Sequence, residues 1–227
     1  MMRSVVVTIF LSLLAGFAKA DNEPLPVKLI PAKASPAPLV FLISGDGGWN
    51  NFIQSVSECL ARKGMPVAGL DSKSYFWKGR SPGQAAADIH KAIISSLKAT
   101  GKKSYILVGY SFGACIVPFI ASRTPENLRQ QMAGVYSISP DERGDFEIHI
   151  SDMLSLGTVK GSYDVVAEMK KIKEKQPVCI FGSAEKSSVV KRFSDAGIKT
   201  VTLSGNHHYN NNYCALAETV ARNEGIK

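Results

Sequence analysis

The segment Gly109–Gly113, which reads Gly-Tyr-Ser-Phe-Gly, constrains the fold of this chain more than any other feature. It fits the pattern G-x-S-x-G. An apolar, β-branched run over residues 104–108 precedes it, and an apolar run that fits a helix follows over 114–121. A strand that turns sharply into a helix here holds the serine hydroxyl exposed at the carboxyl edge of a sheet, and flanking glycines relieve crowding. The context predicts that Ser111 is a nucleophile; the alternative is a glycine-rich turn with an inert serine.

Strands and helices alternate along the rest of the chain. We expect strands over residues 39–43, 66–70, 104–108, 135–139, 178–181 and 199–203, and helices over 52–63, 81–99, 114–121 and 213–222. A proline-rich lead-in over residues 24–38 has room for one edge strand. This order predicts a mostly parallel sheet with right-handed crossovers and helices on both faces. Together with the strand, sharp turn and helix around Ser111, which form the nucleophile elbow of such proteins, it predicts an α/β-hydrolase fold. Only residues 141–163 fit neither element, and they are a candidate lid or substrate loop.

The N-terminus has the pattern of a secretory signal peptide. Arg3 supplies a positive charge, residues 5–14 are apolar, and residues 18–20 form an A-x-A cleavage site. An uncleaved membrane anchor is the alternative, although the apolar stretch is short for a span of about 20 residues. We therefore predict a signal peptide over residues 1–20 and one exported domain over residues 21–227.

Composition narrows the remaining function classes. The formal net charge is +8, and removing Arg3 and Lys19 with the leader leaves +6. A basic exported protein favours an anionic membrane surface or nucleic acid, but the lysines are dispersed and no nucleic-acid motif occurs. No C-x-x-C pair suggests zinc, and we expect neither metal nor cofactor. The four cysteines allow three full pairings, although Cys115 and Cys179 fall in apolar runs that also suit free core thiols.

A serine nucleophile needs a histidine base, which in this fold follows the last strand. Two candidates stand there, His207 and His208. The base is often followed directly by an aromatic residue, and Tyr209 therefore favours His208, with His207 contacting substrate or loop backbone. The other histidines fit less well, because His90 lies within a predicted helix and His149 in the irregular segment.

The acid and the oxyanion hole have expected positions too. Glu185 follows the preceding strand, where it would fix the imidazole tautomer; a surface glutamate is the alternative, and Asp195 is a weaker candidate. The oxyanion donors should be the amide after the nucleophile and one from the loop after the first core strand. We assign them to Phe112 and Asp46, the latter within the glycine-rich segment 44–49.

These motifs together resemble the bacterial virulence protein family of VirJ and the C-terminal domain of AcvB, over nearly the whole mature chain. The resemblance is carried by Gly45–Trp49, Tyr75–Trp77 with Arg80 and Pro82, Gly109–Ala114, Asp145–Glu147, and Gly205 with His207 and His208. It implies an α/β-hydrolase fold, export to the periplasm, and hydrolysis of aminoacyl-phosphatidylglycerol, notably the lysyl form. It also implies a link to type IV secretion of virulence substrates.

The chain departs from the family pattern at two places. Cys115 stands where the family often has Asp, and Tyr209 with an asparagine run stands where it often has Phe with acidic residues. The second change bears on head-group selectivity and leaves the predicted triad untouched.

A cationic lysyl group would favour nearby carboxylates, and the lipid phosphate would favour an arginine or lysine. We predict substrate contacts at Asp46, Trp49, Arg80, Tyr110, Asp145, Glu147 and His207. Two other readings stay open. One is a non-catalytic adaptor or chaperone of a secretion system on a hydrolase scaffold, and the other is a generic carboxylesterase or lipase.

Overall fold

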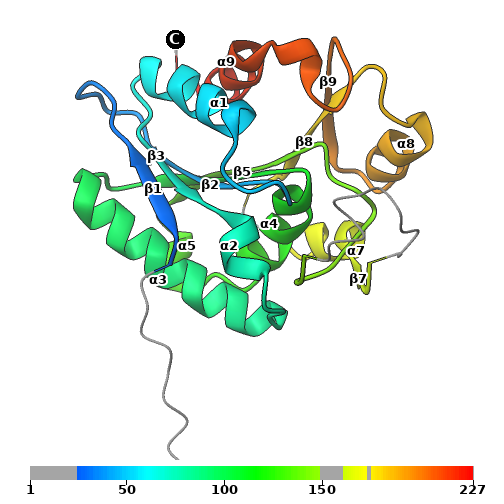
Figure 1. Ribbon diagram of the computed structural model, residues 1–227, viewed down its shortest axis with the longest axis horizontal. Coiled ribbons are helices and arrows are strands. Elements are labelled where there is room, and N and C mark those ends of the chain that lie inside the picture. Colours follow the sequence, from blue (N-terminus) through cyan, green and yellow to red (C-terminus); the bar gives the residue numbers. More distant parts are fainter. Residues whose placement is uncertain (1–24, 149–160, 173–174, 227) are drawn as a thin grey trace, which may run out of the picture.

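The computed structural model describes residues 25–148, 161–172 and 175–226 (Figure 1). Its centre is a seven-stranded sheet in the order β1-β3-β2-β4-β5-β8-β9, parallel except for β1 at one edge. The strands are β1 (Val27–Ile30), β2 (Leu39–Ile43), β3 (Val67–Leu70), β4 (Tyr105–Tyr110), β5 (Met132–Ile138), β8 (Val178–Gly182) and β9 (Lys199–Leu203). The short strands β6 (Arg143–Gly144) and β7 (Tyr163–Asp164) pair separately. This arrangement confirms the predicted mostly parallel sheet.

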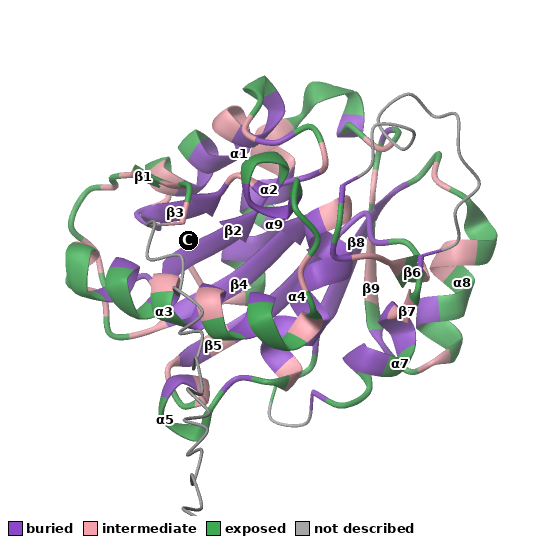
Figure 2. Ribbon diagram, turned by 60° about the horizontal axis from the view of Figure 1, so that its bottom comes forward, coloured by how far each residue is buried: buried purple, intermediate pink, exposed green. Residues whose placement is uncertain are grey.

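Helices cover both faces of the sheet, as the sequence predicts. On one face, α1 (Asn51–Arg62) and α9 (Tyr213–Asn223) pack against each other and the strands. The other face carries α2 (Ser72–Phe76), α3 (Pro82–Thr100), α4 (Phe112–Ser122), α7 (Val165–Met169) and α8 (Ser187–Asp195), while α5 (Glu126–Arg129) precedes β5. Figure 2 shows the central strands buried along their length between these layers. Burial on both faces explains why these strands read as continuous apolar runs.

Local signals in the sequence fix the helix ends. The Ser81 hydroxyl accepts from the Gln84 N–H while the Gln84 side chain accepts from the Ser81 N–H, a reciprocal cap that starts α3 with Pro82 in its first turn. Gly101 ends the helix with φ of 68°, a left-handed conformation that suits glycine. The predicted helix over residues 81–99 therefore agrees with α3 to within a residue or two.

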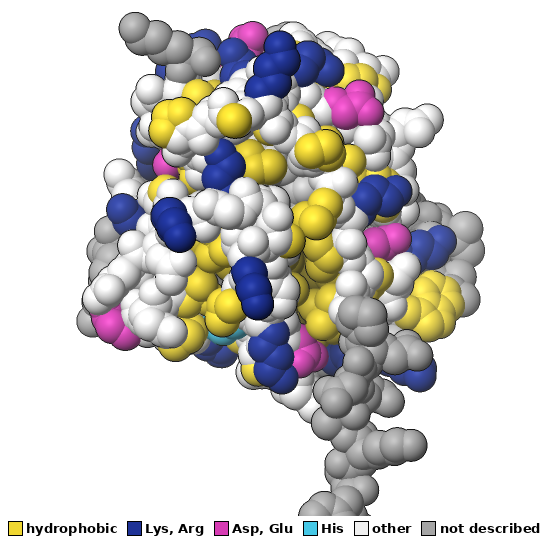
Figure 3. Space-filling model, turned by 90° about the vertical axis from the view of Figure 1, so that its left-hand side faces the viewer, with side chains coloured by type: hydrophobic (Ala, Val, Ile, Leu, Met, Phe, Trp, Pro, Cys, Tyr) yellow, Lys and Arg dark blue, Asp and Glu magenta, His cyan; other side chains and the backbone are white. Residues whose placement is uncertain are grey.

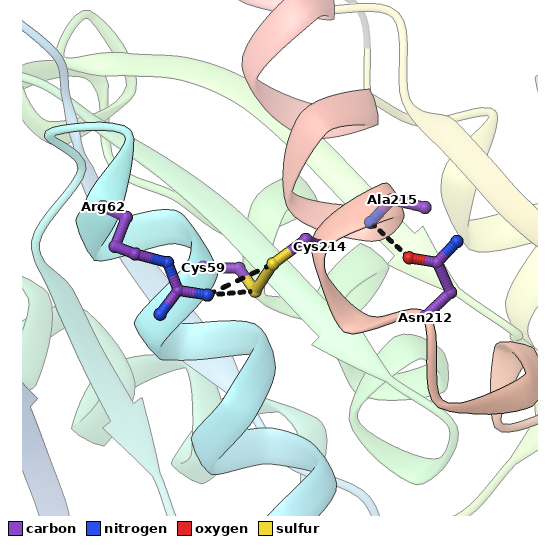
Figure 4. The surroundings of a disulfide bond; sticks show 5 residues. All are labelled: Cys59, Arg62, Asn212, Cys214 and Ala215. Atoms are coloured by element: carbon purple, nitrogen blue, oxygen red, sulfur yellow. Dashed lines mark hydrogen bonds between the residues drawn. A yellow bond between two sulfur atoms is a disulfide. The ribbon is translucent and has the colours of Figure 1, made fainter.

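A disulfide joins the two helices of the α1–α9 face. Cys59 in α1 bonds Cys214 in the first turn of α9, with 5.2 Å between their Cα atoms, while Cys115 and Cys179 are buried free thiols. Nη2 of Arg62 lies 2.9 Å from Cys59 Sγ and 3.2 Å from Cys214 Sγ (Figure 4). The Asn212 side chain accepts from the Ala215 N–H and caps α9 just before the bridge. The bridge thus fixes the start of α9 beside α1.

Two predicted segments fall wholly or partly beyond the described residues. The predicted signal peptide over residues 1–20 lies outside them, as do residues 149–160 of the candidate lid. The described ends of that segment form the β6–β7 pair, which lies against the N-terminal half of α4. Within residues 25–148, 161–172 and 175–226, no helix has both the length and the apolar character of a membrane span.

We expect the disulfide to stabilise the fold because it closes a loop with a sequence separation of 155 residues. A bridge of this kind contributes about 2–4 kcal/mol, which corresponds to about 4–16 °C in Tm for a domain of this size. Replacing both Cys59 and Cys214 by Ser should lower Tm by that amount in scanning calorimetry. Dithiothreitol should lower the Tm of the wild type and leave the double variant unchanged; an equal Tm of reduced and oxidised wild type would contradict the prediction.

Candidate active site

Ser111 lies in the turn between β4 and α4, in a strained backbone conformation with φ of 52° and ψ of −114°. The two flanking glycines permit the turn by allowing backbone contact. A Cβ on Gly109 would lie 2.2 Å from the Gly113 carbonyl oxygen, and a Cβ on Gly113 would lie 2.2 Å from that of Ile43. A side chain at either position would therefore push α4 away from the sheet. The predicted strand, turn and helix are all present, and the turn presents the Ser111 hydroxyl at the carboxyl edge.

Ser111, His207 and Glu185 form one hydrogen-bonded chain from three separate loops. Nε2 of His207 lies 2.9 Å from Ser111 Oγ, and Nδ1 of the same ring lies 2.7 Å from Glu185 Oε1. A carboxylate at Nδ1 holds the proton there, which leaves Nε2 as the acceptor for the serine hydroxyl. This is the geometry of a general base aimed at a nucleophile.

The placement of His207 corrects the sequence-based choice of His208 as the base. The Tyr209 N–H donates to the Asn206 carbonyl at 2.8 Å, so the two histidines occupy the central positions of one tight turn. Their side chains diverge: His207 contacts Ser111, whereas Nδ1 of His208 lies 2.9 Å from the Tyr110 hydroxyl. The aromatic residue that marks the base thus comes two positions after it.

Tyr209 anchors this turn in the core. Its side chain is buried, and its hydroxyl donates to the Ile180 carbonyl at 2.9 Å and lies 2.7 Å from Ser139 Oγ. The residues Tyr209, Asn210 and Asn211 all have positive φ, between 50° and 61°. Gly205, with φ of 119°, has no room for a Cβ because the Tyr209 backbone lies against it. The loop is therefore held from both ends.

Glu185 is placed to orient the imidazole. Its Oε2 accepts from the Gly182 N–H at 2.6 Å and from the Ser139 hydroxyl at 3.0 Å, which leaves Oε1 for His207. Burial raises the pKa of the Glu185 carboxyl, but the hydrogen bonds from His207, Gly182 and Ser139 outweigh it and leave that pKa below its usual value. The group is therefore a carboxylate at neutral pH and can stabilise an imidazolium.

The two expected oxyanion donors lie on either side of Ser111. Phe112 is the first residue of α4, and its N–H has no acceptor among the described residues; the same holds for the N–H of Asp46. Both residues line the same cavity as Ser111 and His207. A helix N-terminus also favours negative charge, so this position suits a developing oxyanion.

The cavity above Ser111 has a volume of about 590 Å³, and most of the charged side chains that line it are acidic. In addition to Glu185, four carboxylates line it: Asp46, Asp141, Asp145 and Glu147. The cations in the wall are Arg143 and Lys186. The Arg143 guanidinium donates to the carbonyls of Gly161 and Ser162, at 2.6 and 2.9 Å, and thereby ties the β6–β7 pair together. The predicted contacts at Asp46, Asp145 and Glu147 are thus brought to the cavity.

Three predicted substrate contacts do not line the cavity. The Trp49 indole covers Gly69 of β3 and donates to Gln54, with the Lys28 ammonium 5.1 Å from its ring. Tyr110 stacks on Phe52 and lies behind the histidines. The Arg80 guanidinium lies 5.2 Å from the Tyr75 ring. The structure thus does not bring Trp49, Arg80 and Tyr110 to the cavity with the other predicted contacts, and their substrate roles stay predictions.

Several residues that line the cavity were not predicted as site residues from the sequence. Asp141 and Arg143 lie in the irregular segment, and Lys186 directly follows the triad acid. Cys115, one turn after the nucleophile, accepts from the Asp141 N–H at 3.3 Å and so holds the acidic wall to α4. Burial raises the pKa of the Cys115 thiol to about 12, which keeps it neutral. The strand–loop positions of Asp141 and Lys186 after β5 and β8 could have marked them, since parallel strands end at one edge.

We expect His207→Ala and His208→Ala to separate sharply on a soluble chromogenic ester. Loss of the base at Ser111 should lower kcat about 10²–10⁴-fold. His208→Ala removes one hydrogen bond to Tyr110, worth about 1 kcal/mol, so its rate should fall about fivefold or less. Thermal unfolding of both variants controls for folding, and the reverse ranking in equally stable proteins would return the role of base to His208.

The fold is similar to that of several solved structures. Est1E from Butyrivibrio proteoclasticus matches with a TM-score of 0.63 at 16% identity, covering 88% of this chain and 94% of that one. A lipase-esterase related protein from Clostridium acetobutylicum matches with 0.64 at 16%, covering 88% and 99%. Proline iminopeptidase from Mycobacterium smegmatis matches with 0.62 at 11%, covering 87% and 94%. At such identities the likeness shows the α/β-hydrolase fold alone.

Sequence comparison is more specific. No curated protein matches this chain significantly. A family model described as bacterial virulence protein (VirJ) matches residues 38–224, nearly the whole described fold. The chain therefore belongs to the VirJ family of bacterial virulence proteins.

Proposed function

We propose that this protein is a serine ester hydrolase that releases the amino acid from aminoacyl-phosphatidylglycerol, with the lysyl form favoured. The observation that carries the proposal is the hydrogen-bonded Ser111–His207–Glu185 chain in a cavity that four further carboxylates help to line. An aminoacyl ester has both features that such a site recognises. Its carbonyl is open to a serine nucleophile, and its amino acid carries one or two ammonium groups.

The reaction follows the order of a serine hydrolase. His207 Nε2 takes the proton of Ser111 as Oγ attacks the aminoacyl carbonyl carbon. The oxyanion accepts from the N–H groups of Phe112 and Asp46. Collapse breaks the ester bond, and the imidazolium gives its proton to the leaving glycerol oxygen of the lipid. Water, deprotonated by His207, then attacks the aminoacyl-serine ester. The bond between the acyl carbon and Ser111 Oγ breaks, the imidazolium returns its proton to Oγ, and the amino acid is released.

The charges of the cavity suit the two ends of this substrate. Ammonium groups of the aminoacyl moiety would lie among Asp46, Asp141, Asp145 and Glu147. The lipid phosphate would meet Lys186, because the other cation in the cavity wall, Arg143, is engaged with backbone carbonyls. This assignment replaces Arg80 with Lys186 as the phosphate contact.

We place the protein in the periplasm, released there by cleavage of residues 1–20. The Cys59–Cys214 disulfide supports an oxidising compartment, because such bonds persist outside the cytosol. Membership of the VirJ family supports a role in virulence, for which proteins of a type IV secretion system are the proposed partners. Control of charged lipid in the membrane around such a machine would connect the reaction with this role.

The alternatives predict a different site. A secretion adaptor on this scaffold needs no hydrogen-bonded Ser-His-Glu chain, yet the three side chains are within 2.7–2.9 Å of one another along it. A generic carboxylesterase explains that chain but not the four carboxylates beside it. The carboxylates that line the cavity would oppose an anionic acyl group.

We expect Ser111→Ala to abolish release of lysine from lysyl-phosphatidylglycerol, because loss of the nucleophile typically lowers kcat by about 10⁶-fold. Thin-layer analysis of lipids incubated with purified wild-type and variant protein measures this directly. Ser95→Ala, which removes an exposed hydroxyl of α3, is the matched control. A folded Ser111→Ala protein that works at the wild-type rate would refute the serine mechanism. A Ser111→Ala protein that restores secretion in a strain lacking the gene would favour the alternative function of a non-catalytic secretion adaptor.

Asp46→Asn tests the charge argument while preserving shape. The half-buried carboxylate should favour the lysyl over the alanyl lipid by about 1 kcal/mol or less, so the preference should fall by up to about fivefold. The ratio of the two initial hydrolysis rates, compared between variant and wild type, measures the change. Glu218→Gln, on the exposed side of α9, removes the same charge away from the cavity and should leave the ratio unchanged. Equal wild-type rates on both lipids would leave a general aminoacyl-lipid esterase.

A further inference from the structure

Positive charge is concentrated in one half of this molecule. Residues 25–103 hold eleven Lys and Arg against four Asp and Glu, a net charge of +7, whereas residues 104–227 hold fourteen against thirteen, a net of +1. The first segment forms β1, β2 and β3 with α1, α2 and α3, which lie together on one side in Figure 1. Figure 3 views that side: Lys and Arg side chains are spread over it, carboxylates are few, and hydrophobic side chains lie between them.

One part of this half combines exposed apolar surface with positive charge. Trp77, at the end of α2, is 48% exposed, and Lys73 and Lys78 beside it in the chain are exposed as well. We call these three residues the α2 rim. The carboxylates nearest to it in sequence are engaged: Asp71 accepts from the Ser74 N–H and Asp88 from the Tyr75 hydroxyl.

The α2 rim borders the catalytic cavity. The Arg80 N–H donates to the Phe146 carbonyl at 2.9 Å and the Ile148 N–H donates to the Phe76 carbonyl at 3.1 Å. These bonds tie the chain on both sides of Trp77 to the segment that contributes Glu147 and Ile148 to the cavity wall.

Two further contacts place α2 beside the oxyanion loop. The Phe76 ring lies 5.2 Å from that of Phe112, the residue after the nucleophile. A Cβ on Gly48 would lie 2.9 Å from Lys73 Cβ, so Lys73 packs against the loop that carries Asp46. The α2 rim therefore lies beside the segments that line the cavity, although its own three residues do not line it.

We propose that the α2 rim is a docking surface for an anionic lipid bilayer. Trp is favoured at membrane interfaces because its ring is apolar while its N–H can reach headgroups and water. Lysines extend their stems along the interface and place their ammonium groups among phosphates. A net-positive half of the molecule would attract such a surface over a Debye length and turn the α2 rim toward it.

Docking in this orientation would bring the cavity mouth to the lipid headgroups, and in this sense it rests on the proposed function. The carboxylates of the cavity wall would repel bulk anionic lipid and admit a headgroup that carries an ammonium group. The basic surface would thus recognise the anionic bilayer that contains the substrate, and the acidic cavity would recognise the aminoacyl group that is cleaved.

Sedimentation with vesicles tests the docking surface independently of hydrolysis. The vesicles contain phosphatidylglycerol without any aminoacyl group, mixed with phosphatidylcholine, so a failure of the proposed reaction does not affect the result. The wild type should bind them, bind pure phosphatidylcholine far less, and lose affinity as sodium chloride increases. Lys73→Gln with Lys78→Gln should weaken binding about fivefold for each charge removed. Trp77→Ala should weaken it by at least about fivefold.

Matched variants locate the surface. Lys170→Gln with Lys175→Gln removes the same charge from exposed positions beyond α7, and Ile94→Ala truncates an exposed apolar residue of α3 that is 51% accessible. Both should bind like the wild type, and thermal unfolding of every variant controls for folding. Trp77 fluorescence should shift to shorter wavelength on vesicles in the Trp49→Phe protein, in which Trp77 is the remaining tryptophan.

Three outcomes would overturn the proposal. The first is equal affinity for anionic and neutral vesicles, and the second is a loss with Ile94→Ala as large as with Trp77→Ala. The third is the absence of any vesicle binding at low salt, which would make the α2 rim a candidate contact for a secretion-system protein instead.

Discussion

The close contact between the start of α4 and the end of β2 is the constraint on which the rest of this site depends. A Cβ at Gly113 would lie 2.2 Å from the Ile43 carbonyl oxygen and 2.6 Å from that of Ser44. Because this position has no side chain, the oxyanion loop that follows β2 can lie beside the nucleophile. Ser111, which directly precedes α4, has a positive φ of 52° in the turn that leads to this contact. The strained turn at Ser111 and the loop that carries Asp46 therefore meet at this one contact between β2 and α4.

His207 is positioned by a second, separate set of contacts. Tyr209 is fixed in the core through Ile180 and Ser139, and Ser139 also donates to Glu185. The Tyr209 hydroxyl and the Glu185 carboxylate thus share one partner, so the histidine turn and the acid are held in register by the ends of β5 and β8. On the opposite side of the turn, the Cys59–Cys214 bridge fixes the helix that follows it. The imidazole is oriented by packing at both ends of its loop as well as by its own hydrogen bonds.

The sequence predicts most of this fold because its signals are local. Periodicity gives the six parallel strands, the caps give the helix ends, and the elbow pattern gives Ser111. Glu185 and the histidine pair follow from chain order. The choice between His207 and His208 does not follow from chain order, because it depends on which of the two central residues of the turn points its side chain toward Ser111. Asp141 and Lys186, and the pairing of Cys59 with Cys214, also depend on contacts between segments far apart in sequence.

The distribution of charge explains how a basic protein can carry an acidic site. The irregular segment after β5 supplies Asp141, Asp145 and Glu147, and the glycine-rich loop supplies Asp46, so the carboxylates converge on the cavity from two sides. The lysines of residues 25–103 lie on the outside of the other half. Exposed charges are screened within about 8 Å at physiological salt, whereas charges in a recessed cavity are screened less. Under the proposed function, the cavity would therefore favour cations even though the net charge of the molecule, which acts at longer range, is positive.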